Sequence, residues 1–178
     1  IRALMMETLH SDVELLRTVN ENIIGHSGKL LRPLVSLLTA KALGSANKDS
    51  IKLAAAAEIL HNATLIHDDV ADESRERRGL PTLMSTLGPS SAVLVGDFWL
   101  AKAVELIYDT ACYSEVSRFF SRTLTDLAEG EMLQLEKSMS GNTSEEDYFR
   151  IIYCKTASLF RAGCVTGAIS VNADEKAV

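Results

Sequence analysis

Apolar side chains recur at spacings of three and four residues along almost the whole chain, and no stretch alternates apolar and polar residues over the length of a strand. This spacing places apolar side chains on one face of an α-helix, so the pattern predicts an all-α protein. The predicted helices cover residues 3–22, 30–43, 50–72, 90–109, 113–139 and 146–170. Long helices joined by short links favour an antiparallel helical bundle, which can enclose a long, narrow cavity.

The bulk composition suits one compact domain and sets limits on partners. With 47% apolar residues among 178, the chain can bury a sizeable core, so we expect a single domain over residues 1–178. Its formal charge of −6 gives no reason to expect nucleic acid or an anionic membrane surface as a partner. No stretch approaches about eighteen uninterrupted apolar residues, so no membrane-spanning helix is predicted.

The cysteines indicate a reducing compartment. Cys112, Cys154 and Cys164 form no CxxC pair and are odd in number. Both features argue against a disulfide framework and against a zinc site. We therefore expect a cytoplasmic protein.

An acidic cluster ends the predicted helix 50–72, within the stretch "TLIHDDVADESRERRGLPT". Steps of three and four residues put His61, Asp68 and Asp72 on one helix face, and Asp69 lies about 100° away from Asp68 around the helix. The macrodipole disfavours carboxylates at a helix C-terminus, so their grouping there needs another reason. Clustered carboxylates suit Mg²⁺, which also takes water and phosphate oxygens as ligands. The alternative is an acidic surface that is simply solvated.

Two basic elements flank this cluster in the sequence. Arg77 and Arg78 follow it, just before the turn that "GLPT" predicts, and guanidinium groups bind phosphate oxygens well. In "GHSGKLLRPL", Lys29 and Arg32 share a face at a helix start, which itself favours anions. Either element could instead be structural, and surface salt bridges between the arginines and the acids would contribute only about 0–1 kcal/mol each. Together with the acidic cluster, they predict sites for two diphosphate groups, one held through Mg²⁺ and one mainly by cations.

Four segments, "GKLLRP", "EILHNATLIHDDVADESRERRGLPT", "EGEMLQL" and "YCKTASLF", resemble the trans-isoprenyl diphosphate synthases and occur in that family's order. The most specific part is DDxxD followed closely by RRGxPT. The sequence is most similar to the long-chain polyprenyl synthases that make quinone side chains. The resemblance implies an isoprenoid-synthase bundle that uses Mg²⁺ to join isopentenyl diphosphate, head to tail, to an allylic diphosphate of farnesyl or geranyl type. The product would be a trans-polyprenyl diphosphate, which can pass to membrane enzymes.

The resemblance also implies a role for individual residues. The metal ligands it implies are Asp68, Asp69 and Asp72. The residues that it places in the isopentenyl diphosphate pocket are Lys29, Arg32, His61 and Arg78. The residues that it places at the allylic diphosphate and the reacting carbon, besides Asp68 and Asp72, are Arg77, Lys155, Thr156 and Gln134. His67 has no role in this scheme and is interpreted as structural.

Two small residues before the acidic cluster predict a long product. Thr64 lies about 40° from Asp68 around the helix and ~6 Å along it, so it can line a channel below the metal site. Ala63 precedes it. In the resembling family, bulky aromatic residues at these two positions stop the growing chain. The small side chains here imply that a product of farnesyl length is extended further.

The sequence departs from the family pattern in two places. Ser27 stands where the family often has a second glycine before Lys29, and no second DDxxD motif occurs. The acids of "SEED", residues 144–147, are no substitute, because acids at a helix start are explained by capping. We therefore expect a partial domain, cut after the N-terminal half to two-thirds of the fold and inactive alone. Bare apolar faces on such a bundle would favour a homodimer.

Two other functions remain open at this point. One is a non-catalytic partner subunit or remnant of such a synthase, which the missing second motif supports. The other is a terpene cyclase or head-to-head condensing enzyme, because those enzymes also use aspartate-rich helices and Mg²⁺. The "GKLLRP" element argues against the latter, since a cyclase binds no isopentenyl diphosphate.

Overall fold

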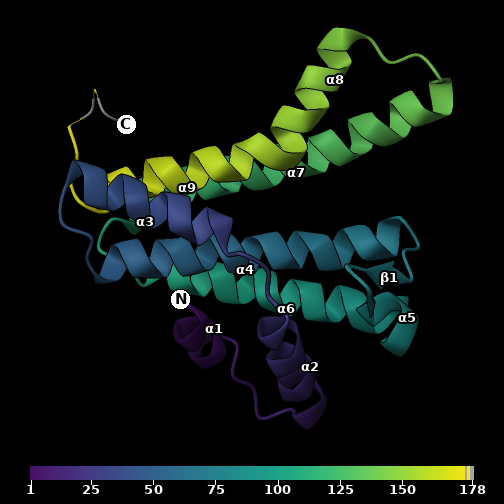
Figure 1. Cartoon of the computed structure of the whole chain (residues 1–178), viewed down its shortest axis with the longest axis horizontal. Helices are drawn as coiled ribbons and strands as arrows, with labels where there is room; N and C mark the ends of the chain where they lie inside the picture. Colours follow the sequence, from purple (N-terminus) through teal and green to yellow (C-terminus); the bar gives the residue numbers. More distant parts are fainter. Residues whose placement is uncertain (175, 177–178) are drawn as a thin grey trace. The chain divides into compact units, whose positions relative to one another are not determined.

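The computed structural model describes residues 1–174 and 176, and these are almost entirely helical (Figure 1). The helices are α1 (Arg2–Thr8), α2 (Glu14–Gly25), α3 (Leu31–Leu43), α4 (Lys48–Ala71), α5 (Leu83–Leu87), α6 (Pro89–Tyr108), α7 (Tyr113–Ser140), α8 (Glu145–Ile152), the π-helix η1 (Tyr153–Ala157) and α9 (Ser158–Ile169). Two short strands, β1 (Glu76–Arg77) and β2 (Leu80–Pro81), pair antiparallel. The prediction of an all-α fold is confirmed. Within the part of the chain that the structure describes, no helix combines the length and apolarity needed to cross a membrane.

The chain divides into two compact units. The first comprises Ile1–Leu30 and Ala55–Asp109, and the second comprises Leu31–Ala54 and Thr110–Val178. Helix α4 belongs to both, since its first turns lie in the second unit and its remaining turns in the first. The expectation of a single domain over residues 1–178 stays a prediction.

A buried polar chain links three elements of the first unit. The Trp99 ring of α6 is fully buried, and its Nε1 donates to Oδ1 of Asn20 on α2 at 2.7 Å. Asn20 Nδ2 in turn donates to the carbonyl of Leu9 at 2.7 Å. The buried indole and amide are therefore hydrogen-bonded rather than left unsatisfied, as buried polar groups require.

In the second unit, α3 packs along α9, and α7 packs along α9 and η1 (Figure 1). Small residues bring these backbones close together. A Cβ at Gly167 would lie 2.5 Å from the carbonyl oxygen of Ser36, so α9 touches the backbone of α3 there. Only glycine fits at this contact without moving one of the two helices.

The predicted helix 3–22 is wrong in its middle, because α1 ends at Thr8 and α2 starts at Glu14. Between them, Ser11 Oγ accepts a hydrogen bond from the Val13 backbone N–H at 3.2 Å. Such local side-chain bonds compete with the helical ladder. The carbonyl of Leu9 is also taken by the Asn20 side chain described above, and this long-range contact leaves no signal in the local pattern.

The predicted helix 146–170 corresponds to three elements, since η1 separates α8 from α9. The short helix α5 and the β1–β2 hairpin were not predicted, although Gly79 and Pro81 correctly indicated a turn. In that turn Arg78 and Gly79 have φ of 55° and 79°. Two successive residues with positive φ are typical of a tight hairpin turn that matches the twist of the strands.

The start of α8 carries the capping box that the acids of "SEED" indicated. Ser144 Oγ accepts from the Asp147 N–H at 3.1 Å, and Asp147 Oδ2 accepts from the Ser144 N–H at 3.0 Å. The bond from the Ser144 backbone, with the hydrogen bond from Lys137, holds the pKa of Asp147 below its usual range. Capping therefore accounts for these acids.

We expect Ser144→Ala to lower the free energy of unfolding by about 0.5–2 kcal/mol, because the Asp147 N–H loses its side-chain acceptor. Urea denaturation at neutral pH measures the change, with the neighbouring Thr143→Ala as the control. Since the folded-state pKa of Asp147 is lowered, its contribution is present above the unfolded-state pKa and lost as the pH falls through the folded-state pKa. The stability that Asp147→Ala loses should therefore shrink as the pH falls, and a loss that persisted unchanged in acid would contradict the role of the Asp147 carboxylate.

Candidate active site

The three predicted aspartates lie at the C-terminal end of α4 in the first unit. The helix ends at Ala71, and the Asp72 N–H still donates to the carbonyl of Asp68 at 2.8 Å. Asp68 and Asp72 are four residues apart and share a helix face. Asp69 is buried, and its Oδ1 accepts from Arg77 Nε at 2.8 Å. Asp69 therefore points to the β1–β2 hairpin, whereas Asp68 and Asp72 share another face of α4.

Two carboxylates on one helix face are a suitable donor set for a metal that is shared with a substrate. Among the residues that the structure describes, no group of three or more His, Cys, Asp or Glu side chains could hold a metal ion. Mg²⁺ commonly takes one or two carboxylates and fills its other positions with water and phosphate oxygens. Asp68 and Asp72 match that requirement. Ligation of a metal by Asp68, Asp69 and Asp72 stays a prediction, and the Asp69 carboxylate is paired with Arg77.

The hairpin brings the two predicted basic elements of the first unit together. A Cβ at Gly28 would lie 2.6 Å from Nη1 of Arg78, so the Arg78 guanidinium lies directly against the Gly28 backbone. Lys29 is the next residue and is exposed. The Arg78 guanidinium therefore lies against the backbone next to Lys29, although about fifty positions separate the two residues in the sequence. The sequence indicated each of these two basic segments but did not predict that they are in contact.

Arg32 lies in the first turn of α3 and belongs to the second unit. Its guanidinium carbon lies 4.6 Å from the centroid of the Phe160 ring on α9, a cation–π distance. Phe160 is the last residue of the "YCKTASLF" segment. The aromatic face orients the Arg32 side chain, and the sequence did not indicate this pair.

The other predicted residues of the second unit are gathered on α7 and η1. Lys155 Nζ donates to Gln134 Oε1 at 2.9 Å and lies 2.6 Å from Glu131 Oε2. Thr156 follows on the same π-helical turn and is exposed. Single π-turns inside helices are frequent at functional sites. The pairing of Lys155 with Gln134 agrees with their predicted placement in one site, whereas Glu131 was missed.

Gly130 explains how η1 comes so close to α7. A Cβ there would lie 2.6 Å from Cβ of Cys154 and 3.2 Å from the backbone nitrogen of Lys155. Any larger residue would push η1 away and carry Lys155 with it. The glycine of "EGEMLQL" was available as a signal, but its partner on η1 lies more than twenty residues away.

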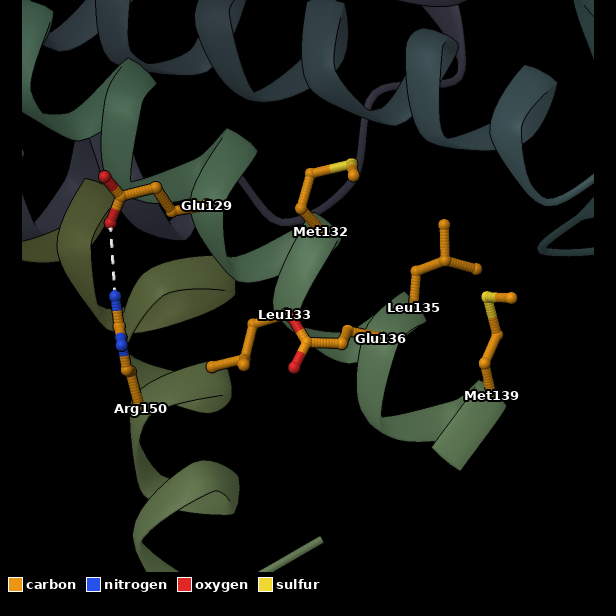
Figure 2. A pocket seen from close by; sticks show the side chains of 7 residues that line it. All are labelled: Glu129, Met132, Leu133, Leu135, Glu136, Met139 and Arg150. Atoms are coloured by element: carbon orange, nitrogen blue, oxygen red, sulfur yellow. Dashed lines mark hydrogen bonds and ion pairs between the residues drawn. The ribbon is translucent and has the colours of Figure 1, made fainter. Parts of the chain in front are cut away.

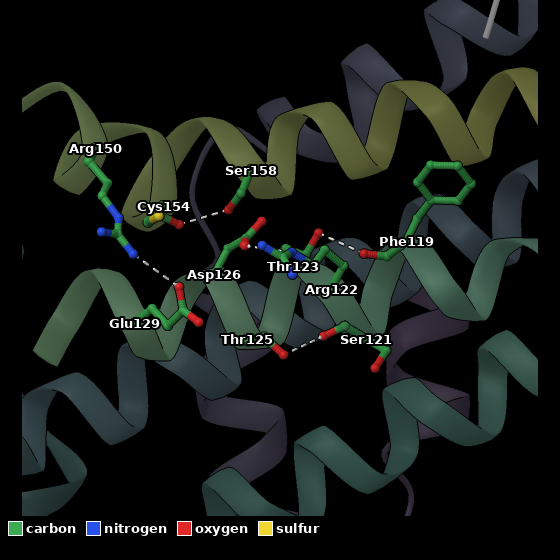
Figure 3. A network of polar contacts seen from close by, with 10 residues as sticks. All are labelled: Phe119, Ser121, Arg122, Thr123, Thr125, Asp126, Glu129, Arg150, Cys154 and Ser158. Carbon is green, nitrogen blue, oxygen red and sulfur yellow. Dashed lines mark hydrogen bonds and ion pairs between the residues drawn. The ribbon is translucent and has the colours of Figure 1, made fainter. Parts of the chain in front are cut away.

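A polar network continues this packing along α7 (Figure 3). Arg122 Nε donates to the buried Asp126 carboxylate at 3.1 Å, and Ser158 Oγ donates to the carbonyl of Cys154 at 2.7 Å. Burial, with the nearby Asp126 charge, raises the pKa of the Cys154 thiol. Cys154 is buried and its Cβ lies against Gly130, so it packs η1 on α7.

A groove of about 490 Å³ lies on α7 and α8 of the second unit (Figure 2). The residues that line it are Glu129, Met132, Leu133, Leu135, Glu136, Met139 and Arg150. None of the predicted substrate-binding residues is among them. At one end, Arg150 and Glu129 form an ion pair at 3.5 Å.

The predicted chain-length residues, Ala63 and Thr64, lie five and four residues before Asp68 on α4. Ala63 is buried, with 1% of its surface exposed, and Thr64 is half-buried. The Thr64 hydroxyl donates to the carbonyl of His61 at 2.9 Å. Their role in limiting product length stays a prediction.

Comparison with known proteins shows the family of this chain. Residues 13–178 match the family model described as polyprenyl synthetase, and the chain belongs to that family. The predicted resemblance to trans-isoprenyl diphosphate synthases of the long-chain kind is thereby confirmed.

Individual relatives are similar over most of this chain. The octaprenyl diphosphate synthase of Escherichia coli (strain K12) is 38% identical over 169 residues, which are 95% of this chain and 52% of that protein. The all-trans-nonaprenyl-diphosphate synthase (geranyl-diphosphate specific) of Rhodobacter capsulatus is 43% identical over 164 residues, which are 92% of this chain and 50% of that protein. The chain therefore spans about half the length of these curated relatives.

A solved structure shows the same fold. The polyprenyl synthase from Caulobacter crescentus CB15, complexed with calcium and isoprenyl diphosphate, matches with a TM-score of 0.92 at 41% identity. The match covers 97% of this chain and 52% of that one.

Proposed function

We propose that this chain carries the diphosphate-binding half of a trans-polyprenyl diphosphate synthase. The enzyme joins isopentenyl diphosphate, head to tail, to an allylic diphosphate of farnesyl or geranyl type. One observation carries the proposal: the acidic end of α4 is tied to the Arg77 of the hairpin at 2.8 Å, and the hairpin's Arg78 lies against Gly28 beside Lys29. These contacts lie within the first unit, which thus contains both carboxylates that can bind a metal and cations that can bind phosphate.

The allylic diphosphate is assigned to Asp68, Asp72 and Arg77. Mg²⁺ held by the two carboxylates would neutralise charge on the leaving diphosphate. Asp69 accepts from Nε of Arg77, and the terminal amino groups of that guanidinium are the donors that we assign to phosphate oxygens. Asp69 therefore acts as the group that orients Arg77.

Isopentenyl diphosphate is assigned to Lys29, Arg32, His61 and Arg78. The cations of this set need no metal to bind a diphosphate. After the alkene attacks the allylic carbon, the released diphosphate is the base to which the proton goes, so the scheme needs no side-chain base. Lys155, Thr156 and Gln134 are assigned to the reacting end of the allylic substrate, and Lys155 is held in place there by Gln134 and Glu131.

The alternative of a non-catalytic partner subunit is less well supported. The relatives described above are synthases by name, and the first aspartate-rich motif and the arginines that follow it are present. We propose further that the protein works as a cytoplasmic homodimer, that its product can pass to membrane enzymes, and that residues 1–178 alone turn over little substrate. Comparing condensation by residues 1–178 and by the full-length protein, with Mg²⁺ and both diphosphates, distinguishes these functions. No activity in the full-length protein would favour the non-catalytic alternative.

We expect the two hairpin arginines to affect different substrates in the full-length protein. Arg78→Ala should raise KM for isopentenyl diphosphate more than KM for the allylic substrate, through loss of a charge-assisted contact of about 1.5–3 kcal/mol. Arg77→Lys should show the reverse bias, because it keeps a charge beside Asp69 but loses the guanidinium fork. Steady-state kinetics with each substrate varied in turn measures both.

Arg75→Ala is the matched control, since Arg75 is exposed and lies next to the same hairpin. Its KM values should stay close to those of the unsubstituted protein. If Arg77 and Arg78 variants raised both KM values equally, the assignment of the two sites would be wrong.

A further inference from the structure

We propose that His67 is a positioning residue: docked in a notch on α6, it sets the rotation of the last turns of α4 and so aims Asp68 and Asp72 at a shared metal. This inference rests on the proposed function of those two carboxylates. It replaces the interpretation of His67 as merely structural. The contacts that carry it all lie within the first unit.

The notch is made by a glycine inside α6. A Cβ at Gly96 would overlap Nε2 and Cδ2 of the His67 ring and would lie 3.0 Å from Cε1. The imidazole therefore packs directly on the α6 backbone. Gly96 is buried, lies in the middle of a 20-residue helix and has no positive φ. A glycine there weakens the helix relative to alanine, and the room it leaves for the ring is the evident structural reason for it.

Two acceptors on α6 hold the ring in the notch. His67 Nε2 lies 3.3 Å from Oδ1 of Asp97 and 3.4 Å from the carbonyl oxygen of Val93. Since both partners accept, Nε2 carries the hydrogen that is shared between them. The Val93 carbonyl belongs to the backbone of α6, so this hydrogen bond restrains the position of α4 relative to the α6 backbone. Asp97 then selects the ring orientation in which Nε2 faces α6.

A second anchor acts on the other side of α4. At about 100° per residue, Asp69 lies about 200° from His67 around the helix. Its ion pair with Arg77 ties that side to the hairpin at 2.8 Å. On the same scale, Asp68 lies about 100° and Asp72 about 140° from His67. Both proposed metal ligands therefore occupy the arc between the two anchored residues.

This position needs anchoring because it is the end of a helix. Helix α4 stops at Ala71, and terminal turns lose intrahelical hydrogen bonds and fray. The two carboxylates repel each other and oppose the helix dipole. A metal site requires its ligands to be held within about 0.5 Å and 10–20° of the productive geometry. The His67 contact supplies part of that restraint without touching the metal.

A double-substitution experiment on the full-length protein tests the idea. The probe is inorganic diphosphate titrated calorimetrically in the presence of Mg²⁺, without turnover. We expect Gly96→Ala and His67→Ala each to raise the Kd for inorganic diphosphate about tenfold. This is the smaller end of the loss in affinity that follows removal of a group that orients metal ligands. In the His67→Ala background the ring is gone, so Gly96→Ala should add nothing further.

Two further variants separate positioning from general destabilisation. His67→Gln, whose amide nitrogen can reach the place of Nε2, should restore Kd to within about threefold of the unsubstituted protein. Gly25→Ala is the matched glycine control, because a Cβ there meets nothing within 4 Å, and it should leave Kd unchanged. Melting temperatures are recorded for every variant. If Gly96→Ala alone does not fold, His67→Ala, His67→Gln and the double variant still give the comparison.

The outcomes are distinct. Equal Kd values in the unsubstituted protein and in His67→Ala would overturn the inference while leaving the proposed function intact. Kd changes that follow the melting temperature in all variants, with no rescue by His67→Gln, would also overturn it. If the unsubstituted protein showed no Mg²⁺-dependent binding of diphosphate, the proposed function would fall and this inference with it.

Discussion

Asp68→Ala should lower turnover of the full-length protein by about 100- to 1000-fold, the usual effect of removing one group that stabilises developing charge in the transition state. Its effect on stability should be small. The Asp68 carboxylate lies in the last turn of α4, where it opposes the helix dipole, and relief of that cost, about 0.3–1 kcal/mol, offsets the loss of its other interactions. Activity and thermal unfolding measured on the same preparation test both statements.

Glu76→Ala is the matched control for this prediction. Glu76 is an exposed acid on β1, close in sequence to the proposed site but without a role in it. Its removal should leave turnover within a factor of about two, as expected for a surface substitution. If Asp68→Ala lost activity and melting temperature together, Asp68 would be a structural residue and the metal site would need other ligands.

Thr64→Phe should shorten the product without abolishing condensation. Thr64 lies about one turn before Asp68 on the same side of α4 and is only half-buried, so a phenyl ring can extend from the helix there. The diphosphate and metal ligands remain unchanged. Chromatography of the dephosphorylated products should show a shift from long polyprenyl chains to chains near farnesyl length.

The structure makes Thr64 a better test position than Ala63. Ala63 is 1% exposed, and a phenyl ring there would overpack the interior at a cost of about 1–3 kcal/mol. Leu94→Phe is the control, because Leu94 is 69% exposed on α6 and should leave the product distribution unchanged. An unchanged long-chain distribution in Thr64→Phe would show that the chain grows along another path.

Features that depend on neighbouring residues were readable from the sequence. The long helices follow from apolar spacing: on α7, for example, the buried residues Val116, Phe120 and Thr123 recur at steps of four and three that can be read in the sequence. The capping box at Ser144 and Asp147 needs only a three-residue spacing and was anticipated as capping. The acidic motif and the arginines after it lie within one short segment, so their family resemblance could be recognised before any fold was known.

Features that depend on distant contacts were not readable. The break between α1 and α2 involves Asn20, whose side chain bonds both the Leu9 carbonyl and Trp99 on α6. The π-turn that carries Lys155 packs against Gly130 on helix α7. In both cases the local sequence favours a regular helix, and a contact made elsewhere in the chain changes it.

The sequence by itself determined the all-α fold class, the family and the identity of the charged residues, because each of these is encoded in short-range spacing. The tertiary structure decided what those residues do with one another. It paired Asp69 with Arg77, laid Arg78 against Gly28 and docked His67 on Gly96. A hydrogen bond or a close packing contact depends on distances of a few ångströms between segments, and only the folded chain sets those distances.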